Sequence, residues 1–147
     1  MADRRTITIE VLRYQPEKAA EPYRENWVIP YTEDMSVLQG LQYIKDELDG
    51  SLTFRWSCRM AICGSCGMMI NGVPSLGCRS FLRDYHGKVS IEALANMPIE
   101  RDLVVNADDF MAKLARIKPW LMPKEPRALE EGEHLQTPAP RRLLVAN

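Results

Sequence analysis

Cysteine is concentrated in one short stretch of this 147-residue chain. Cys58, Cys63 and Cys66 are separated by four residues and then by two, and Cys78 follows after eleven more. Glycines flank the closely spaced pair, and glycine lets the backbone approach a bound group and adopt positive φ angles. Thiols at such short, fixed spacings are typical of a metal site.

The spacing of the cysteines favours an iron–sulfur cluster over a single ion. Plant-type 2Fe–2S sites have the pattern C-x4-C-x2-C with a separate fourth cysteine, so that four thiolates hold two irons. Backbone amides of the loop and nearby positive charge would both favour the added electron. The sequence therefore predicts a 2Fe–2S cluster whose metal and cofactor ligands are Cys58, Cys63, Cys66 and Cys78.

Three other uses of the cysteines are less favoured. A structural zinc site normally has two short C-x2–4-C knuckles, and the interval between Cys66 and Cys78 is too wide for one. A thioredoxin-type redox motif would need only Cys63 and Cys66, leaving Cys58 and Cys78 unexplained. Two disulfides are least favoured, because the N-terminus MADRRTITIE has no secretory h-region and disulfides are rare in reducing compartments.

Composition excludes several classes of function. The chain is 46% hydrophobic and 27% charged, as expected for a soluble globular domain. Its net charge of −1 does not favour nucleic acid as a partner. No apolar run reaches the roughly 18 residues that a membrane span requires. We find no nucleophile–base pair, phosphate loop or catalytic carboxylate pair, so no catalytic residue is predicted.

The first third of the chain predicts a β-β-α order. Residues 6–13 alternate between apolar β-branched and polar side chains, and residues 27–29 form a second short apolar strand that Pro30 ends. Ser36 and Gln39 match a capping box, and apolar residues at helical spacing follow as far as Gly50, which is placed to end the helix.

Further elements follow the cysteine loop. Asn71-Gly72 predicts a tight type I′ turn in a hairpin, and residues 88–94 predict another strand. Asn106 is placed to cap a helix that Pro119 ends. The predicted organisation is a domain over residues 1–105, a helix over 106–122, and a proline-rich linker or tail over 123–147.

The segment FRWSCRMAICGSCGMMING resembles the cluster loop of the iron–sulfur subunit of succinate dehydrogenase and fumarate reductase. YIKDELDGSLTFRWSCR, EALANMPIERDLVV and IKPWL are also similar to that subunit, more in the fumarate reductase style, and the resemblance spans about residues 5–138. It implies an α+β fold, with a β-grasp (2Fe–2S ferredoxin-like) domain, a C-terminal helix and an irregular tail. The ligands of that family fall on the same four cysteines.

The resemblance also implies a function. A non-catalytic subunit of a succinate:quinone oxidoreductase would relay electrons between the FAD of a flavoprotein subunit and downstream iron–sulfur centres and quinone. Its partners would be that flavoprotein, membrane anchor subunits indirectly, and a separate chain carrying further clusters. It would lie in the cytoplasm, peripheral on the inner face of the cell membrane. The 4Fe–4S and 3Fe–4S clusters of the family's helical domain are not supported, because no cysteine follows Cys78.

Two rival functions stay open on the sequence alone. A free-standing 2Fe–2S ferredoxin that shuttles electrons between enzymes would also use this loop, although arginines rather than acidic residues border it. A truncated copy that binds its cluster and does nothing is the second. The shuttle would have a reduction potential near about −400 mV, whereas a centre that accepts electrons from a succinate-oxidising flavin would lie well above that.

Overall fold

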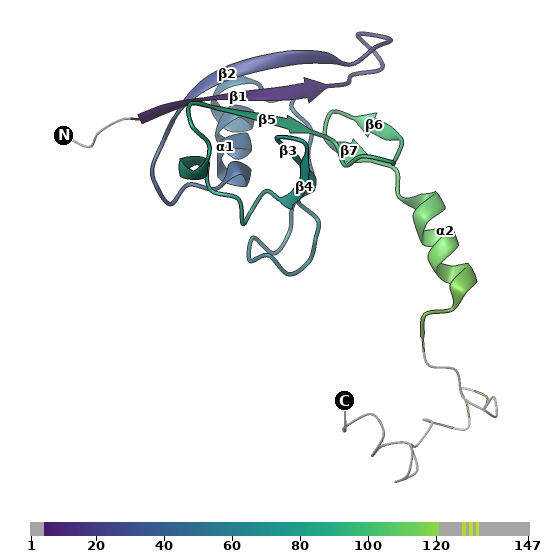
Figure 1. The fold of residues 1–147 in the computed structure, drawn as a ribbon. Coiled ribbons are helices and arrows are strands. Elements are labelled where there is room, and N and C mark those ends of the chain that lie inside the picture. The colour runs from purple at the N-terminus through teal and green to yellow at the C-terminus, as the bar shows by residue number, and fades with distance from the viewer. Residues whose placement is uncertain (1–4, 121–127, 129, 131, 133–147) are drawn as a thin grey trace. The chain divides into compact units, whose positions relative to one another are not determined.

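The computed structural model describes residues 5–120 together with residues 128, 130 and 132 (Figure 1). Residues 1–109 form one compact unit and a second unit begins at residue 110. Apart from those three positions, the tail predicted over residues 123–147 lies outside the described residues. Among the helices that the structure describes, none is long and apolar enough to cross a membrane.

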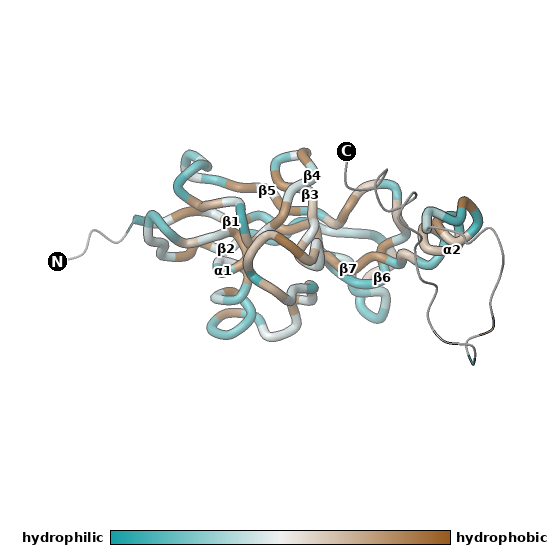
Figure 2. The backbone as a smooth tube through the Cα atoms, turned by 90° about the horizontal axis from the view of Figure 1, so that it is seen from below, coloured by the Kyte–Doolittle hydropathy of each residue, from teal (hydrophilic) through white to brown (hydrophobic). Residues whose placement is uncertain are grey.

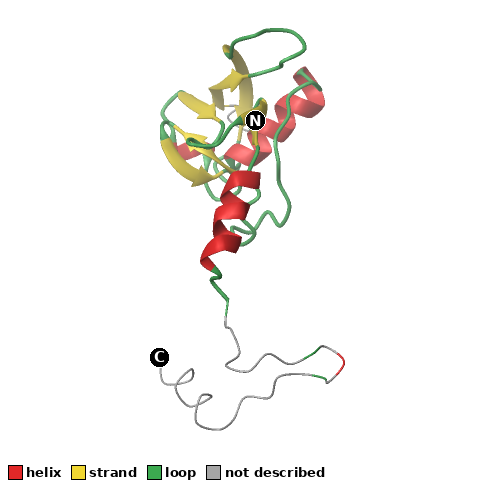
Figure 3. Cartoon of the chain, turned by 90° about the vertical axis from the view of Figure 1, so that its right-hand side faces the viewer, coloured by secondary structure: helices red, strands yellow, loops and turns green. Residues whose placement is uncertain are grey.

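Five strands form a mixed sheet in the order β2-β1-β5-β3-β4. β1 pairs with β5 in parallel, and the other neighbours are antiparallel. Figure 3 shows the strands of the sheet in yellow and the helices in red. Helix α1 contributes buried Val37 and Leu41 to the core. This arrangement is the predicted α+β, ferredoxin-like fold. The strands are β1 (Arg5–Arg13), β2 (Tyr23–Tyr31), β3 (Gly67–Ile70), β4 (Val73–Leu76) and β5 (Lys88–Glu92).

The first hairpin confirms the alternating pattern but is longer than predicted. Every second residue of β1 from Ile7 to Arg13 is buried. β2 continues through Pro30, which pairs with Thr6, so the prediction that Pro30 ends the strand was wrong. Proline is tolerated there because β2 is an outer strand, whose N–H groups on one side face solvent. The other outer strand, β4, also carries a proline, Pro74.

Helix α1 (Val37–Tyr43) begins as predicted. The Oγ of Ser36 accepts the N–H of Gln39 at 3.2 Å, and the Gln39 Oε1 accepts the N–H of Ser36 at 2.8 Å, which completes the capping box. A π-helical turn, η1 (Ile44–Leu48), then replaces the regular helix expected up to Gly50. The helical segment ends one residue earlier, at extended Asp49, because that side chain is held by other partners described below.

The second half of the unit is only partly as predicted. Asn71 and Gly72 both have positive φ, as a type I′ turn requires. The short 3-10 helix η2 (Leu82–Asp84) and the hairpin of β6 (Ile99–Arg101) with β7 (Val104–Val105) were not predicted. Helix α2 (Asp108–Ile117) begins where Asn106 Oδ1 accepts the N–H of Asp108, and ends at left-handed Lys118, before Pro119.

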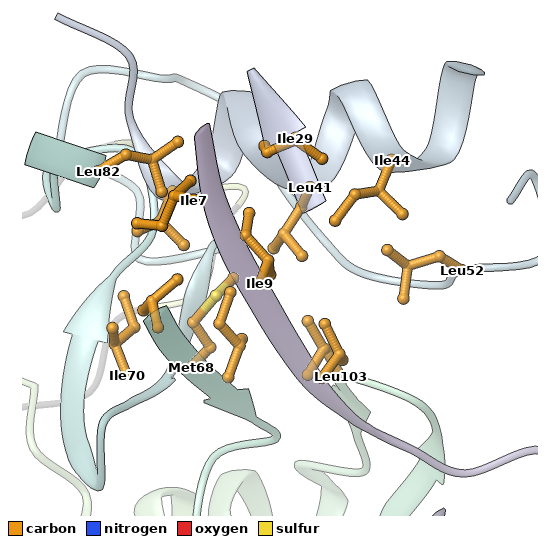
Figure 4. Close-up of a cluster of buried hydrophobic side chains, with 14 residues drawn as sticks. Ile7, Ile9, Ile29, Leu41, Ile44, Leu52, Met68, Ile70, Leu82 and Leu103 are labelled. Carbon is orange, nitrogen blue, oxygen red and sulfur yellow. The ribbon is translucent and has the colours of Figure 1, made fainter. Parts of the chain in front are cut away.

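The core lies between the sheet and α1. Figure 4 shows aliphatic side chains from β1, β2, α1, β3 and the segment around residue 52 meeting there. In Figure 2 the corresponding parts of the tube are brown, that is, hydrophobic. The fully buried members include Ile7, Ile9, Ile29, Leu41, Ile44, Leu52, Met68, Ile70, Leu82 and Ile91.

A buried ion network ties three distant segments together. The guanidinium of Arg13, at the end of β1, donates from Nε to Asp102 Oδ1 at 2.9 Å and from NH1 to Asp49 Oδ2 at 2.6 Å. Asp102 is itself fully buried and accepts the backbone N–H of Thr53 at 2.8 Å. The network therefore joins β1, the turn between β6 and β7, and the chain that leads from η1 into the cysteine loop.

Arg13 and Asp49 stay charged within this network. Burial disfavours the charged form of Asp49, but hydrogen bonds from Ser51 and Arg13 outweigh it and lower its pKa to about 2. Burial likewise acts against the charge of Arg13, and its hydrogen bonds to Asp102 and Asp49 outweigh that effect and raise its pKa. Removing Arg13 would leave the fully buried Asp102 without its counter-ion, which is strongly unfavourable.

We expect Asp102→Asn to lower the free energy of unfolding by about 3 kcal/mol, because it removes the fully buried counter-ion of Arg13 and leaves this guanidinium only the more exposed carboxylates of Glu25 and Asp49. The measurement is guanidinium unfolding of the cluster-loaded protein under argon, followed by circular dichroism. Glu17→Gln is the control, since Glu17 pairs with Arg101 where both side chains are more than a third exposed. That control should change stability by less than about 1 kcal/mol, and equal effects of the two variants would contradict a dominant role for the network.

Candidate iron–sulfur site

The four cysteines gather on the segment that leads into β3 and on the turn that follows β4. Cys63 is exposed, Cys58 and Cys78 are half-buried, and Cys66 is buried. None of them is in a disulfide. The loop that carries the first two is drawn in teal in Figure 1, beside β4.

Cys58 and Cys63 are joined through the backbone of a tight loop. The Sγ of Cys58 accepts the N–H of Cys63 at 3.3 Å and that of Met60 at 3.4 Å. The Sγ of Cys63 accepts the N–H of Cys58 at 3.5 Å. Each of these two thiols therefore already faces backbone donors.

Cys66 and Cys78 are brought together by the β3–β4 hairpin. The hairpin pairs Gly67 with Leu76, and one step further the N–H of Gly77 donates to the carbonyl of Cys66 at 3.0 Å. The N–H of Ala61 reaches across to the Sγ of Cys78 at 3.3 Å, which links this pair to the loop around Cys58.

Three left-handed residues give the loop its path. Arg59, Ala61 and Gly64 have φ of 59°, 60° and 74°. Glycine adopts this conformation freely, whereas Arg59 and Ala61 do so at a cost of about 1–2 kcal/mol each. Arg59 and Ala61 flank Met60, and the N–H groups of Met60 and Ala61 both donate to sulfur. Such strained backbone is typical of functional sites.

The surroundings of Cys63 and Cys66 shift the pKa of their thiols in opposite directions. The hydrogen bond from the backbone N–H of Cys58, with further bonds from Ser65, lowers the pKa of Cys63 to about 6. Burial raises the pKa of Cys66. Because the thiolate is the form that binds metal, Cys63 is prepared for ligation before any metal arrives.

The donor set fits a binuclear cluster. A 2Fe–2S cluster takes two thiolates per iron, and the hairpin and the loop supply the cysteines in two pairs. N–H groups aimed at sulfur are the hydrogen bonds that such a cluster uses.

A hollow lies beside the site, between α1 and Cys78. It has a volume of about 220 Å³, is open to solvent, and is lined by Ser36, Leu38, Gln39, Gln42, Arg59, Cys78 and Phe81. The Arg59 guanidinium stacks over the ring of Trp56, 4.2 Å from its centroid. The first turn of α1 is fixed to this region, since the N–H of Leu38 donates to the carbonyl of Gly77 at 2.9 Å.

Sequence reasoning found the cysteines but missed the residues that aim donors at them. The backbone N–H groups of Met60 and Ala61 carry no signal in their side chains, and nothing in arginine or alanine marks a left-handed residue. Gln39 was predicted only as part of the capping box, and Gln42 was not singled out. Their place beside Cys78 depends on how α1 packs against the loop.

A family model described as a 2Fe-2S iron-sulfur cluster binding domain matches residues 8–112. The match covers the sheet, the cysteine loop and most of the remaining compact unit. This chain belongs to that family. Its cofactor is therefore a 2Fe–2S cluster, as the spacing of its cysteines predicted.

Several curated proteins named "Fumarate reductase iron-sulfur subunit" are similar to this chain. That of Mycobacterium tuberculosis is 54% identical over 140 residues, which are 95% of this chain and 56% of the relative. That of Haemophilus influenzae is 52% identical, over 91% of this chain and 52% of the relative. That of Escherichia coli O157:H7 is 50% identical, over 95% and 57%. The chain thus spans just over half the length of these relatives.

A solved structure described as the Mycobacterium smegmatis Sdh1 complex in the apo form has the same fold. The similarity has a TM-score of 0.74 at 23% sequence identity, and covers 95% of this chain and 57% of that one. The predicted ferredoxin-like architecture is thereby confirmed.

Substitutions at Ala61 test the left-handed loop. We expect Ala61→Val to destabilise the loop by about 1–3 kcal/mol, because a β-branched residue is poorly compatible with positive φ. Ala61→Gly should keep or improve stability, because glycine adopts this φ without strain. The measurement is the rate at which the visible cluster absorption bleaches with a chelator under argon. Equal rates for the Val and Gly variants would show that the backbone geometry at residue 61 does not matter.

Proposed function

We propose that this chain relays single electrons through a 2Fe–2S cluster held by Cys58, Cys63, Cys66 and Cys78, as the iron–sulfur component of a fumarate reductase or succinate dehydrogenase type of complex. The observation that carries the proposal is the pairing of these cysteines among backbone donors, in a chain about half identical to fumarate reductase iron–sulfur subunits. Cys58 and Cys63 would hold one iron, and Cys66 and Cys78 the other.

When bound, a 2Fe–2S cluster takes up and releases one electron. The N–H groups of Met60, Ala61 and Cys63 stabilise the additional negative charge on the sulfurs they face, which favours reduction. The Arg59 side chain adds a positive charge to the wall beside Cys78 and acts in the same direction.

The partners follow from the same proposal. A flavoprotein subunit would exchange electrons between its FAD and this chain, and the exposed face around Cys63 is the natural point of approach. Downstream centres and quinone would be reached through other parts of the complex. Association with the inner face of the cell membrane would be peripheral, through anchor subunits.

A redox titration of the purified chain, followed by EPR with iron and sulfide counted, tests the proposal. We expect a rhombic 2Fe–2S signal with a midpoint potential well above about −400 mV, the value typical of plant-type ferredoxins. A signal only near that low potential would contradict the respiratory role and favour a free-standing shuttle. Zinc in place of iron, in protein purified without air, would overturn both.

Single substitutions identify the ligands. We expect Cys58→Ser, Cys63→Ser, Cys66→Ser and Cys78→Ser each to lose most of the acid-labile sulfide and to change the EPR line shape, because hydroxyl oxygen is a poorer ligand for iron than thiolate. Met60→Leu is the control, since Met60 is an exposed side chain in the same loop. A cysteine variant that keeps the parent's sulfide content and line shape would remove that residue from the ligand set.

A further inference from the structure

The charged residues in the sequence around the cysteines are all positive. Between Asp49 and Asp84 the sequence contains no aspartate or glutamate, but it contains four arginines, Arg55, Arg59, Arg79 and Arg83. The whole chain has 20 acidic residues, so this stretch departs from the balance of the rest. It is also the stretch that carries all four cysteines.

Three of these arginines have no acidic neighbour in the part of the chain that the structure describes. Elsewhere in that part, cations such as Arg24, Lys88 and Arg101 are paired with carboxylates. Arg55, Arg59 and Arg79 are exposed and form no ion pair with any described residue. The surface at the cysteine loop is therefore a cationic patch that no carboxylate of the described residues compensates.

Arg59 is the member of this patch that is held in position. Its guanidinium face lies over Trp56, and stacking uses the face while leaving the N–H donors at the edge free. The planar edge of a guanidinium matches a carboxylate, to which it donates two parallel hydrogen bonds.

The hollow next to Arg59 offers further donors. The Oε1 of Gln39 accepts from Ser36, which leaves the Gln39 amide NH2 without a partner among the described residues. Gln42 lines the same hollow, and Cys78 lies in its wall. A volume of about 220 Å³ has room for a carboxylate side chain. The hollow thus combines one cation and amide donors immediately beside a cysteine of the site.

Apolar side chains surround this charged centre. Trp56 is 44% exposed, Met60 65% and Ile62 77%. Tryptophan, methionine and arginine are the residue types enriched at protein interfaces, where lysine and acidic residues are depleted. A protein partner fits this composition better than a small anion does.

We infer that the hollow between α1 and Cys78 receives an aspartate or glutamate side chain of the redox partner, which pairs with Arg59 when the partner docks on the cysteine loop. This inference rests on the proposed function, since it identifies how the electron-exchange partner is recognised. The carboxylate places a negative charge beside Cys78, so the oxidised chain binds the partner more tightly than the reduced chain by linkage.

The test measures the affinity of the cluster-loaded chain for the flavoprotein subunit of the same organism, at 50 and 300 mM NaCl. We expect Arg59→Glu to weaken binding at least about tenfold at low salt and to reduce its salt dependence. Arg59→Lys keeps the charge but loses the planar fork, so its effect should be smaller. Lys18→Glu is the matched control, because Lys18 is exposed in the turn between β1 and β2, and it should change the affinity by less than about twofold.

A second variant leaves the cysteine loop unchanged. Gln42→Glu, on α1, places the chain's own carboxylate at the hollow, and we expect it to weaken partner binding as Arg59→Glu does. The 2Fe–2S EPR signal of every variant is recorded first. If both Arg59→Glu and Gln42→Glu keep that signal and bind like Lys18→Glu, the inference is wrong and the proposed function stands. If the parent chain shows no 2Fe–2S signal, both fail.

Binding of the parent chain to vesicles of anionic lipid, with no measurable affinity for the flavoprotein subunit, would also overturn the inference. The cationic patch would then serve a membrane surface instead of a protein carboxylate.

Discussion

The rest of the compact unit depends on the ion pairs that the buried guanidinium of Arg13 makes. Its acidic partners are Glu25, Asp49 and Asp102, which lie 12, 36 and 89 residues away in sequence, and the planar fork engages all three at once. Burying the charges of Arg13 and Asp102 is costly, and these ion pairs offset that cost. The chain therefore cannot shift the end of β1, the entry to the cysteine loop or the β6–β7 turn independently of one another.

This constraint explains how a loop with little apolar material keeps a defined path. Residues 55–65 include no buried side chain. The ends of this segment are fixed instead by Thr53, whose N–H donates to Asp102, and by β3, which enters the sheet directly after Cys66. Between these ends the backbone is free to direct its N–H groups toward sulfur. A loop held only at its ends tolerates left-handed residues that a packed segment would not.

Local signals in the sequence were sufficient for much of the fold and for the cysteines. The capping box of Ser36 and the Asn71-Gly72 turn depend on residues close together in the chain, and both are confirmed. The spacing of the cysteines is equally local, and the 2Fe–2S cofactor that it predicted agrees with the matching family model. The Arg13 network was not predictable, because its members are far apart and each resembles an ordinary surface charge. The length of β2 was underestimated because Pro30 ends a central strand but not an outer one. The left-handed residues of the loop follow from sulfur hydrogen bonding, which has no side-chain signature.

The prolines in the two outer strands have a consequence for the behaviour of the protein in a crowded cell. Pro30 in β2 and Pro74 in β4 each remove a backbone donor from a strand that borders the sheet. An unprotected border invites strands of other chains to add to it, which is how many sheets aggregate. The molecule thus discourages partners that would extend its sheet, while the cysteine loop keeps its apolar and cationic surface open. The prolines at the two edges of the sheet thus oppose unwanted strand addition, and the cysteine loop presents the surface that a specific partner can bind.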